Sequence, residues 1–311
     1  MLQPRKYTCL TPETVERFGN LELIARGIVE GYISGLHQSP HHGFSVEFAE
    51  YREYVPGDPI RHIDWTIYGR NDRLVIRQYE QETNLRATIV LDCSTSLDFK
   101  SRSPLTKFQY ACYTAAALVY LLNRQQDAVG LVTHAERIGK FFPPRTSAAA
   151  VREMLLHLDQ ARPAGRTGLA SAYHALAEQL PRRSLVILLT DLFDETGAVL
   201  RALRHFRHRR HEVMLFHLLD EAELNFPYQG LIEFQDLETA ERMEVEAELV
   251  RDAVQAGVRE FVSTYRKACA DARIEYHVLN TAEPFEKALA AYWARRLHPE
   301  CGDHGGKEGH F

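Results

Sequence analysis

The chain has 311 residues, of which 45% are hydrophobic and 25% charged, with a formal net charge of −5. This composition is ordinary for a globular protein, and the small negative charge argues against a nucleic-acid binder that neutralises phosphates. No run approaches the roughly 18 apolar residues of a transmembrane helix, and the first residues lack the apolar core of a signal peptide. Five scattered cysteines without a Cys-x-x-Cys pair indicate neither a disulfide framework nor a zinc ribbon, so we expect a cytoplasmic protein.

The first 84 residues differ from the rest and are expected to form an N-terminal extension (1–84). Residues 1–36 have the features of a helical lead-in, in which Thr11-Pro12-Glu13-Thr14 supplies an N-cap and a first-turn proline. An apolar face follows, formed by Leu21, Leu23, Ile24 and Ile28. Three histidines then occur between residues 37 and 42, beside a proline and a glycine, and we interpret them as part of a polar loop rather than a metal site.

Residues 43–83 are dense in charged and aromatic side chains. Pro56-Gly57-Asp58 predicts a turn, and residues 74–79 predict a strand. The planar guanidinium group is suited to internal ion pairs, which we expect among Arg52, Arg61, Arg70, Asp58, Asp64 and Glu80. A docking surface for another protein is the alternative that the sequence leaves open.

From residue 85 onward strands and helices alternate, which is typical of a parallel α/β sheet. Strands are expected near 86–92, 128–133, 185–189, 213–218 and 274–279, and helices near 106–123, 147–158, 168–180, 195–208, 246–271 and 284–297. A strand near 138–142 follows its predecessor too closely for a parallel crossover, so it must be antiparallel. Residues 221–245 look like a β-hairpin insertion, and the Gly- and His-rich tail 299–311 is expected to be mobile.

The carboxyl end of the first of these strands carries the most informative motif. The apolar run Ile89-Val90-Leu91 predicts a strand buried on both faces, and it leads into Asp92, Ser94 and Ser96 at alternate positions. One carboxylate and two hydroxyls at this spacing can point at one spot. Hard oxygen ligands of this kind suit a small divalent cation such as Mg²⁺ and suit zinc poorly.

Two further oxygen-bearing side chains are expected at the same place. Asp191 follows strand 185–189, and Thr167 precedes helix 168–180. Open parallel sheets bind ligands outside the carboxyl ends of their strands, where the strand order reverses. If the strands ending at Asp92 and Asp191 are neighbours there, their side chains converge with the three hydroxyls, and at least one position around the metal stays open.

Each of these residues also has a purely structural interpretation. Thr167 could cap the helix that follows it, and Asp191 could cap the next one, with Asp194 as a competitor for that position. Cys93, between the motif residues, is better interpreted as a small buried apolar group than as a nucleophile.

Together these motifs resemble known families. Residues 85–298 resemble a von Willebrand factor A-type domain, and the pattern Asp92, Ser94, Ser96, Thr167 and Asp191 is similar to that family's metal-ion-dependent adhesion site. The upstream run of Glu47-Phe48, Arg52-x-Tyr54, Gly57-Asp58, Arg61-x-Ile63-Asp64-Trp65 and Arg70 resembles the bacterial family called domain of unknown function 58. The likeness spans about residues 27–298. It implies a Rossmann-like, mainly parallel six-stranded sheet with helices on both faces and strand order 3-2-1-4-5-6.

The resemblance also implies a function. The five motif residues would hold Mg²⁺, or another divalent cation such as Mn²⁺ or Ca²⁺, and an acidic residue of a protein partner would complete the coordination. Such families are often encoded beside MoxR-type AAA+ ATPases, so an ATPase of that type is the implied partner. We therefore expect an adaptor or substrate recogniser rather than an enzyme, without a transmembrane segment and without a nucleic-acid ligand.

Two alternatives remain open at this point. A Mg²⁺-dependent hydrolase acting on phosphate esters would use the two carboxylates and the metal to position water, with His134 and Asp194 assisting. Against it, Gly165-Arg166-Thr167-Gly168 is too short for a phosphate-binding P-loop. Alternatively, the motif residues only rigidify the loops that carry them.

Overall fold

The computed structural model describes residues 11–12, 20–38, 50–54, 67–69, 73–78 and 85–297. The chain forms two compact units, Met1–Ser34 with Leu85–Phe311, and Gly35–Asn84. In the smaller unit β1 (Glu50–Glu53) pairs antiparallel with β2 (Val75–Gln78), within the strand expected at 74–79. Most of the charged and aromatic segment 43–83 lies outside the described residues, as do two of the three histidines and the tail 299–311.

The long helix near the start of the chain packs on the larger unit. Helix α2 (Leu21–Gln38) begins after Asn20, whose side chain accepts hydrogen bonds from the backbone of Glu22 and Leu23. Its buried face packs into the core of the larger unit, so this helix belongs with the α/β fold rather than with the segment after it. Leu23 is 60% exposed and does not belong to the apolar face. His37 lies in the helix, so the expected loop does not include it.

The larger unit is built on one six-stranded sheet with the order β10-β7-β6-β3-β4-β5. All neighbouring strands are parallel except β4 and β5. In chain order this is 3-2-1-4-5-6, which confirms the expected mainly parallel sheet with one antiparallel edge strand. The strands are β3 (Arg86–Asp92), β4 (Ala128–His134), β5 (Ile138–Arg145), β6 (Leu185–Thr190), β7 (Glu212–Leu219) and β10 (Glu275–Asn280).

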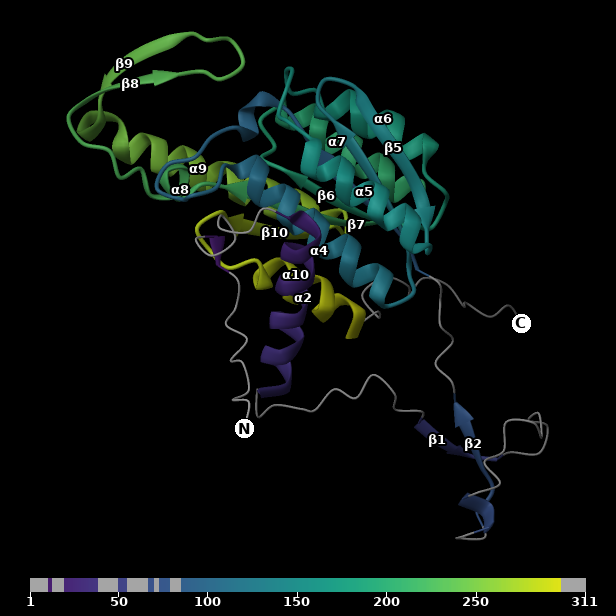
Figure 1. Cartoon of the computed structure of the whole chain (residues 1–311). Coiled ribbons are helices and arrows are strands. Elements are labelled where there is room, and N and C mark those ends of the chain that lie inside the picture. Colours follow the sequence, from purple (N-terminus) through teal and green to yellow (C-terminus); the bar gives the residue numbers. More distant parts are fainter. Residues whose placement is uncertain are drawn as a thin grey trace, which may run out of the picture. The chain divides into compact units, whose positions relative to one another are not determined.

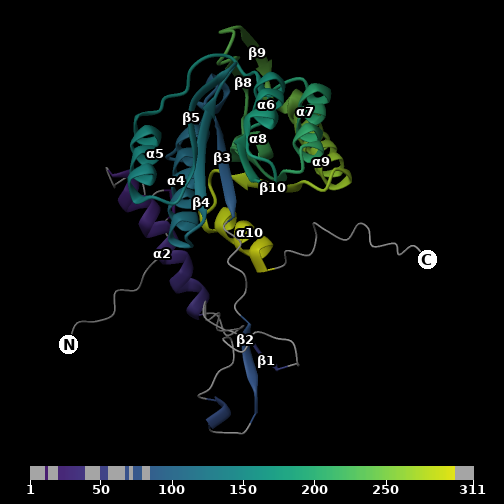
Figure 2. The same cartoon turned by 90° about the vertical axis from the view of Figure 1, so that its right-hand side faces the viewer.

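Helices cover both faces of the sheet, as Figures 1 and 2 show. The core on one face joins the sheet to α2, α4 (Lys107–Arg124), α5 (Ala148–Gln160) and α10 (Glu286–Leu297). The core on the other face joins it to α6 (Leu169–Gln179), α7 (Thr196–His208) and α9 (Ala247–Asp271). None of the described helices combines the length and the apolar character needed to cross a membrane.

The central strand β3 owes its position to its side chains. Six of its seven residues are buried. Successive side chains point to opposite faces of a strand, and accordingly Ile89 lies in the first core and Val90 in the second. A strand with apolar residues on both faces is stable only where helices cover both sides.

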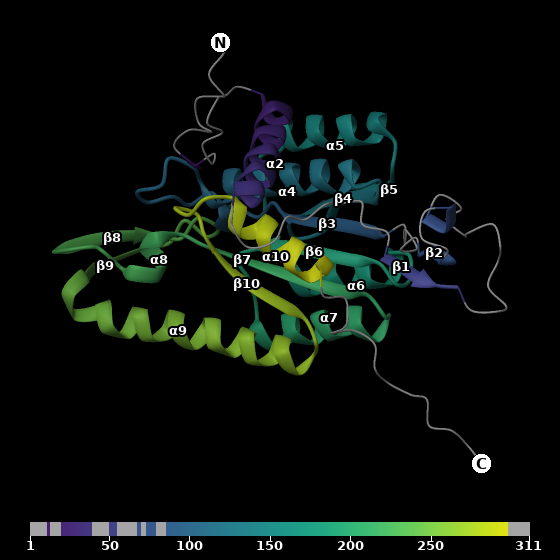
Figure 3. The same ribbon diagram turned by 90° about the horizontal axis from the view of Figure 1, so that it is seen from below.

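The insertion after β7 consists of a short helix and a β-hairpin. It begins with the short helix α8 (Glu221–Asn225) and continues into strands β8 (Leu231–Gln235) and β9 (Arg242–Glu246). These strands pair antiparallel, which confirms the expected hairpin. We call residues 231–246 the β8–β9 arm; it lies beside the first turns of α9, away from the strands of the sheet (Figure 3).

The antiparallel edge depends on close backbone contact at Gly130. The pairing of β4 with β5 shifts register between Val129 and Leu131. A Cβ atom on Gly130 would lie 2.7 Å from the carbonyl oxygen of Phe142 and 2.9 Å from the nitrogen of Pro144. Because both neighbours are backbone atoms, they cannot move aside without breaking the pairing.

Replacing this glycine should therefore destabilise the fold. For Gly130→Ala we expect the free energy of unfolding to fall by about 1–3 kcal/mol, the usual cost of forcing atoms into a packed interior. Gly257→Ala in α9 is the matched control, since no atom lies within 4 Å of the added Cβ and alanine favours helix by about 0.5–1 kcal/mol. Urea unfolding of both variants measures the difference; equal stabilities would contradict the packing argument.

Candidate functional site

The candidate site lies where the direction of the strand connections reverses. Strands β3 and β6 are parallel neighbours, and the chain continues from β3 to β4 on one side and from β6 to β7 on the other. Asp92 ends β3, and Asp191 directly follows β6. The sheet therefore brings together the carboxyl ends of the two strands that sequence reasoning paired.

Asp92 is fully buried at the bottom of this site. One carboxylate oxygen accepts the backbone N–H of Ser94 at 2.9 Å, and the other accepts the hydroxyl of Thr190 at 2.7 Å. Burial raises the pKa of Asp92, the charge of His134 opposes this rise, and the nearby charge of Asp191 adds to it. No described Lys, Arg or His lies within ion-pair distance of Asp92.

The three hydroxyls of the predicted site form a contiguous row. Ser94 Oγ lies 2.9 Å from Ser96 Oγ, and Ser96 Oγ lies 3.5 Å from Thr167 Oγ1. Ser94 precedes the short 3₁₀ helix Thr95–Leu97, which turns Ser96 back toward it. Residues 71 positions apart in the sequence thus meet as a cluster of neutral oxygen ligands.

The loop that carries Thr167 is fixed by its two flanking glycines. Gly165 has φ +83°, a conformation that side chains disfavour. Its carbonyl oxygen accepts both the backbone N–H and the hydroxyl of Thr95, at 3.0 and 2.7 Å. A Cβ on Gly168 would lie 2.8 Å from the backbone of Glu136, so only glycine allows this approach. The Gly-x-x-Gly spacing therefore positions Thr167 against the Asp-x-Ser-x-Ser loop.

Asp191 differs from Asp92 because it already has a cationic partner. Its Oδ2 lies 2.9 Å from Lys107 Nζ, and Lys107 also contacts Glu223 Oε1 at 2.8 Å. Burial acts to lower the pKa of Lys107, but the two carboxylates outweigh it and the pKa is raised. The lysine is therefore charged and neutralises Asp191 in the interior. Leu192, the next residue, is buried with φ +62°, a strained conformation of the kind found at functional sites.

Sequence reasoning missed Lys107 and Glu223, although one signal was present. Lys107 is the first residue of α4, behind the N-cap Thr106. A positive charge is unfavourable at a helix N-terminus, which indicates that this lysine serves a contact elsewhere.

The purely structural interpretations of the motif residues do not match the observed caps. Thr167 does not cap α6, because the N-cap of this helix is Gly168. In the first turn of α6, the backbone N–H of Ala170 donates to Asp194 Oδ2 at 3.3 Å. Glu195 caps α7, so neither Asp191 nor Asp194 has that role. Burial raises the pKa of the Cys93 thiol to about 12, which keeps it protonated and unreactive.

The structure also shows the surroundings of His134 and Asp194, the residues suggested as helpers in a hydrolase. His134 is 1% exposed, and its Nε2 has no hydrogen-bond partner within the described part of the chain. The Asp194 carboxylate is already engaged by the backbone N–H groups of Ala170 and Glu195.

The donor set fits a hard divalent cation. Two buried carboxylates and three clustered hydroxyls are the ligand type that Mg²⁺ prefers. Between residues 85 and 297 and in the shorter described segments, no group of three or more His, Cys, Asp or Glu side chains is placed to hold a metal ion, here or elsewhere. A cation at this site would therefore depend on two carboxylates together with hydroxyls. The uncompensated charge of Asp92 is the feature that a bound cation would relieve.

A further carboxylate reaches this site from the β8–β9 arm. Glu238, in the turn between the two strands, accepts the backbone N–H of Thr167 at 3.0 Å and its hydroxyl at 2.5 Å. No pattern in the sequence indicated this contact, because the arm is an insertion 71 residues away in the chain.

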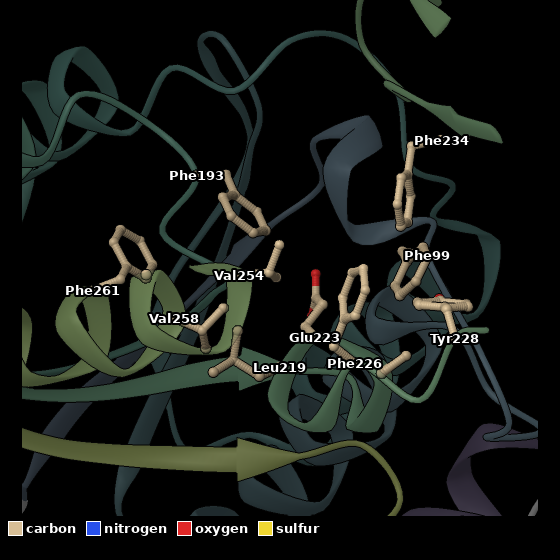
Figure 4. A pocket seen from close by; sticks show the side chains of 12 residues that line it. Phe99, Phe193, Leu219, Glu223, Phe226, Tyr228, Phe234, Val254, Val258 and Phe261 are labelled. Carbon is tan, nitrogen blue, oxygen red and sulfur yellow. The ribbon is translucent and has the colours of Figure 1, made fainter. Parts of the chain in front are cut away.

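An apolar pocket of about 480 Å³ adjoins the ion pairs of Lys107. Figure 4 shows aromatic and aliphatic side chains around the carboxylate of Glu223. Phe99 comes from the loop that carries Ser96, and Phe193 follows Asp191, so the loops of the candidate site also form part of this pocket. The remaining principal lining residues come from the segment between α8 and β8, from β8 and from α9: Phe226, Tyr228, Phe234, Val254, Val258 and Phe261.

Comparison with known proteins places the chain in a family. The model of the family described as "Protein of unknown function DUF58" matches residues 50–263, more than half of the chain. The chain belongs to this family. Curated relatives of the DUF58 protein include the uncharacterized proteins Rv1480 and MT1527 of Mycobacterium tuberculosis and Mb1516 of Mycobacterium bovis, each 29% identical over 73% of this chain and 72% of the relative.

Solved structures with a similar course of the chain come from two Bacteroides species. A conserved hypothetical protein BatB from Bacteroides thetaiotaomicron is 15% identical, with a TM-score of 0.46 over 68% of this chain and 98% of its own. An aerotolerance-related membrane protein from Bacteroides fragilis is 16% identical, with a TM-score of 0.46 over 68% of this chain and 99% of its own.

Behind Asp191 the DUF58 protein holds a buried histidine in the neutral form. His217 Nε2 lies 3.1 Å from the carbonyl oxygen of Asp191, and its Nδ1 lies 2.6 Å from the hydroxyl of Tyr276. A neutral ring satisfies both contacts by donating to the carbonyl and accepting from the hydroxyl. Burial lowers the pKa of His217 to about 4.

This histidine should make stability depend on pH. In the unfolded chain it takes up a proton near pH 6.5, whereas in the folded protein it does so only near pH 4. Its contribution is therefore complete above pH 6.5 and is lost as the pH falls toward 4, by about 3 kcal/mol in total. We expect His217→Gln, which does not titrate, to flatten the dependence of unfolding free energy on pH in this window. His208→Gln, at an exposed position of α7, is the control, and equal slopes in both variants would contradict the assignment.

Proposed function

We propose that this DUF58 protein is a metal-dependent protein-interaction module with a von Willebrand factor A-like fold. Asp92, Ser94, Ser96, Thr167 and Asp191 would hold a Mg²⁺ ion, or Mn²⁺ or Ca²⁺ in its place. The single observation that carries the proposal is the row of three hydroxyls beside a buried carboxylate with no described ion-pair partner.

The charges of the site support binding of an acidic group from outside. A bound divalent cation is a large local charge that favours an incoming anion. Lys107 already neutralises Asp191. The site therefore repels a partner's carboxylate less strongly than two uncompensated carboxylates would. When bound, the ion would supply an open coordination position that an Asp or Glu of the partner completes.

The nature of the partner follows from the family resemblance and from the pocket. We infer a MoxR-type AAA+ ATPase, for which the protein acts in the cytoplasm as an adaptor or substrate recogniser. The pocket shared by the loops of Ser96 and Asp191 offers a place for an apolar side chain close to the partner's acid. A contact that needs both an acidic and an apolar group would be selective, because each of these groups alone is common on protein surfaces.

Metal binding should be visible as stabilisation that depends on Asp92. A ligand that binds only the folded state at 100 times its dissociation constant adds about 2.7 kcal/mol, which we expect Mg²⁺ to provide to the wild type relative to EDTA. Asp92→Asn should lose this gain and should melt at a higher temperature than the wild type in EDTA, because it removes a buried charge. Asp98→Asn, exposed in the same loop, is the control. A gain that Asp92→Asn retains would contradict the proposed site.

Binding of the ATPase tests the function itself. We expect the purified ATPase to bind the wild type and Asp98→Asn in Mg²⁺, and to lose at least about tenfold in affinity with EDTA or with Asp92→Asn, the loss of roughly one charge-assisted contact. Calorimetry in the two buffers measures this. Equal affinity of all three proteins in both buffers would refute a metal-bridged interaction.

A further inference from the structure

The turn of the β8–β9 arm is bound to the candidate site by a single side chain. Residues 236–241 form this turn, and within it only Glu238 is not exposed. Both of its hydrogen bonds from Thr167, at 3.0 and 2.5 Å, go to the same carboxylate oxygen. The arm therefore places an anionic oxygen on a residue of the hydroxyl row.

The turn is shaped to present this carboxylate. Asp236 Oδ1 accepts the backbone N–H groups of Glu238 and Thr239, at 2.7 and 2.8 Å. These bonds lower the pKa of Asp236, and the charge of Arg166 adds to the effect.

Strand β8 of the arm also takes part in the apolar pocket. Phe234 of β8 packs against Phe226 and Tyr228, with ring centroids 5.8 and 5.6 Å apart. All three rings line the pocket beside the Lys107 ion pairs. The same element thus covers a polar ligand position with Glu238 of its turn and an apolar surface with Phe234 of β8.

We propose that Glu238 is a built-in carboxylate ligand, which occupies the position of the partner's acidic side chain and keeps the site closed until the partner displaces it. This inference rests on the proposed function. Glu238 already engages Thr167, which is one of the five residues expected at the metal. It also carries the chemical group that the partner would bring.

Competition with Glu238 sets a minimum affinity that a partner needs in order to occupy the site. A tethered ligand acts at an effective concentration of the order of mM, so a free carboxylate has to compete with Glu238 and binds the wild type more weakly. A partner that combines an acidic residue with an apolar side chain for the pocket can displace Glu238, because it gains contacts that the arm's turn does not make. The arm then limits binding to partners with both features.

Two variants of the turn test this inference. Glu238→Ala removes the carboxylate from Thr167, and Glu241→Ala removes the same charge from an exposed position of the same turn. The probe is a glutamate with blocked amino and α-carboxyl groups, and Mn²⁺ is bound at the site as a paramagnetic ion. Broadening of the probe's side-chain NMR signals reports its binding next to the metal.

We expect Glu238→Ala to bind the probe about tenfold more tightly than the wild type, the equivalent of one hydrogen bond to a charged group, and Glu241→Ala to behave as the wild type. Normal Mn²⁺ binding with equal probe affinities in the two variants would overturn the built-in ligand alone. Absence of Asp92-dependent Mn²⁺ binding in the wild type would overturn the proposed function together with this inference.

A second measurement needs no metal. Hydrogen exchange of the amides of residues 231–246 should be about tenfold faster in Glu238→Ala than in Glu241→Ala, because the turn loses its contact with Thr167. Exchange in β3 and β6 should stay unchanged. Equal protection of the arm in both variants would also overturn the inference.

Discussion

The site depends on one unfavourable arrangement, a buried carboxylate at the end of the central strand without an ion-pair partner among the described residues. Asp92 accepts hydrogen bonds from Ser94 and Thr190, yet burial still raises its pKa. Such a group is costly unless a cation compensates it. Among the described residues the fold supplies neutral oxygens around it rather than a lysine or arginine, and the proposed divalent ion would provide the missing positive charge.

Of the two acidic residues of the site, only Asp191 has an ion-pair partner among the described residues. The elements that carry the partners explain this difference. Asp191 leaves the neighbouring strand and meets Lys107 from the start of α4, which also binds Glu223 from the insertion. The same insertion sends Glu238 to Thr167. The insertion therefore contacts the site from two directions, and it links the ion pairs at one end of the site to the hydroxyl row at the other.

Most of the sheet could be predicted from the sequence, because apolar strands alternate with amphipathic helices and the short spacing before β5 forces an antiparallel turn. The convergence of Ser94, Ser96 and Thr167 was also predictable, since it follows from the order of the strands. The contacts of Lys107 and Glu238 were not, because side chains far apart in the chain meet there without any periodic pattern. The docking of α2 on the larger unit was not predicted, because the apolar face of Leu21, Ile24 and Ile28 does not show which surface it covers.

Anomalous X-ray scattering from crystals grown with Mn²⁺ would test the central claim most directly, because it locates the ion without reference to any binding partner. The account predicts a single strong peak bordered by Ser94, Ser96 and Thr167, with Asp92 beneath it, and no such peak in crystals of Asp92→Asn. A peak at another place in the wild type, or none at all at saturating Mn²⁺, would contradict it.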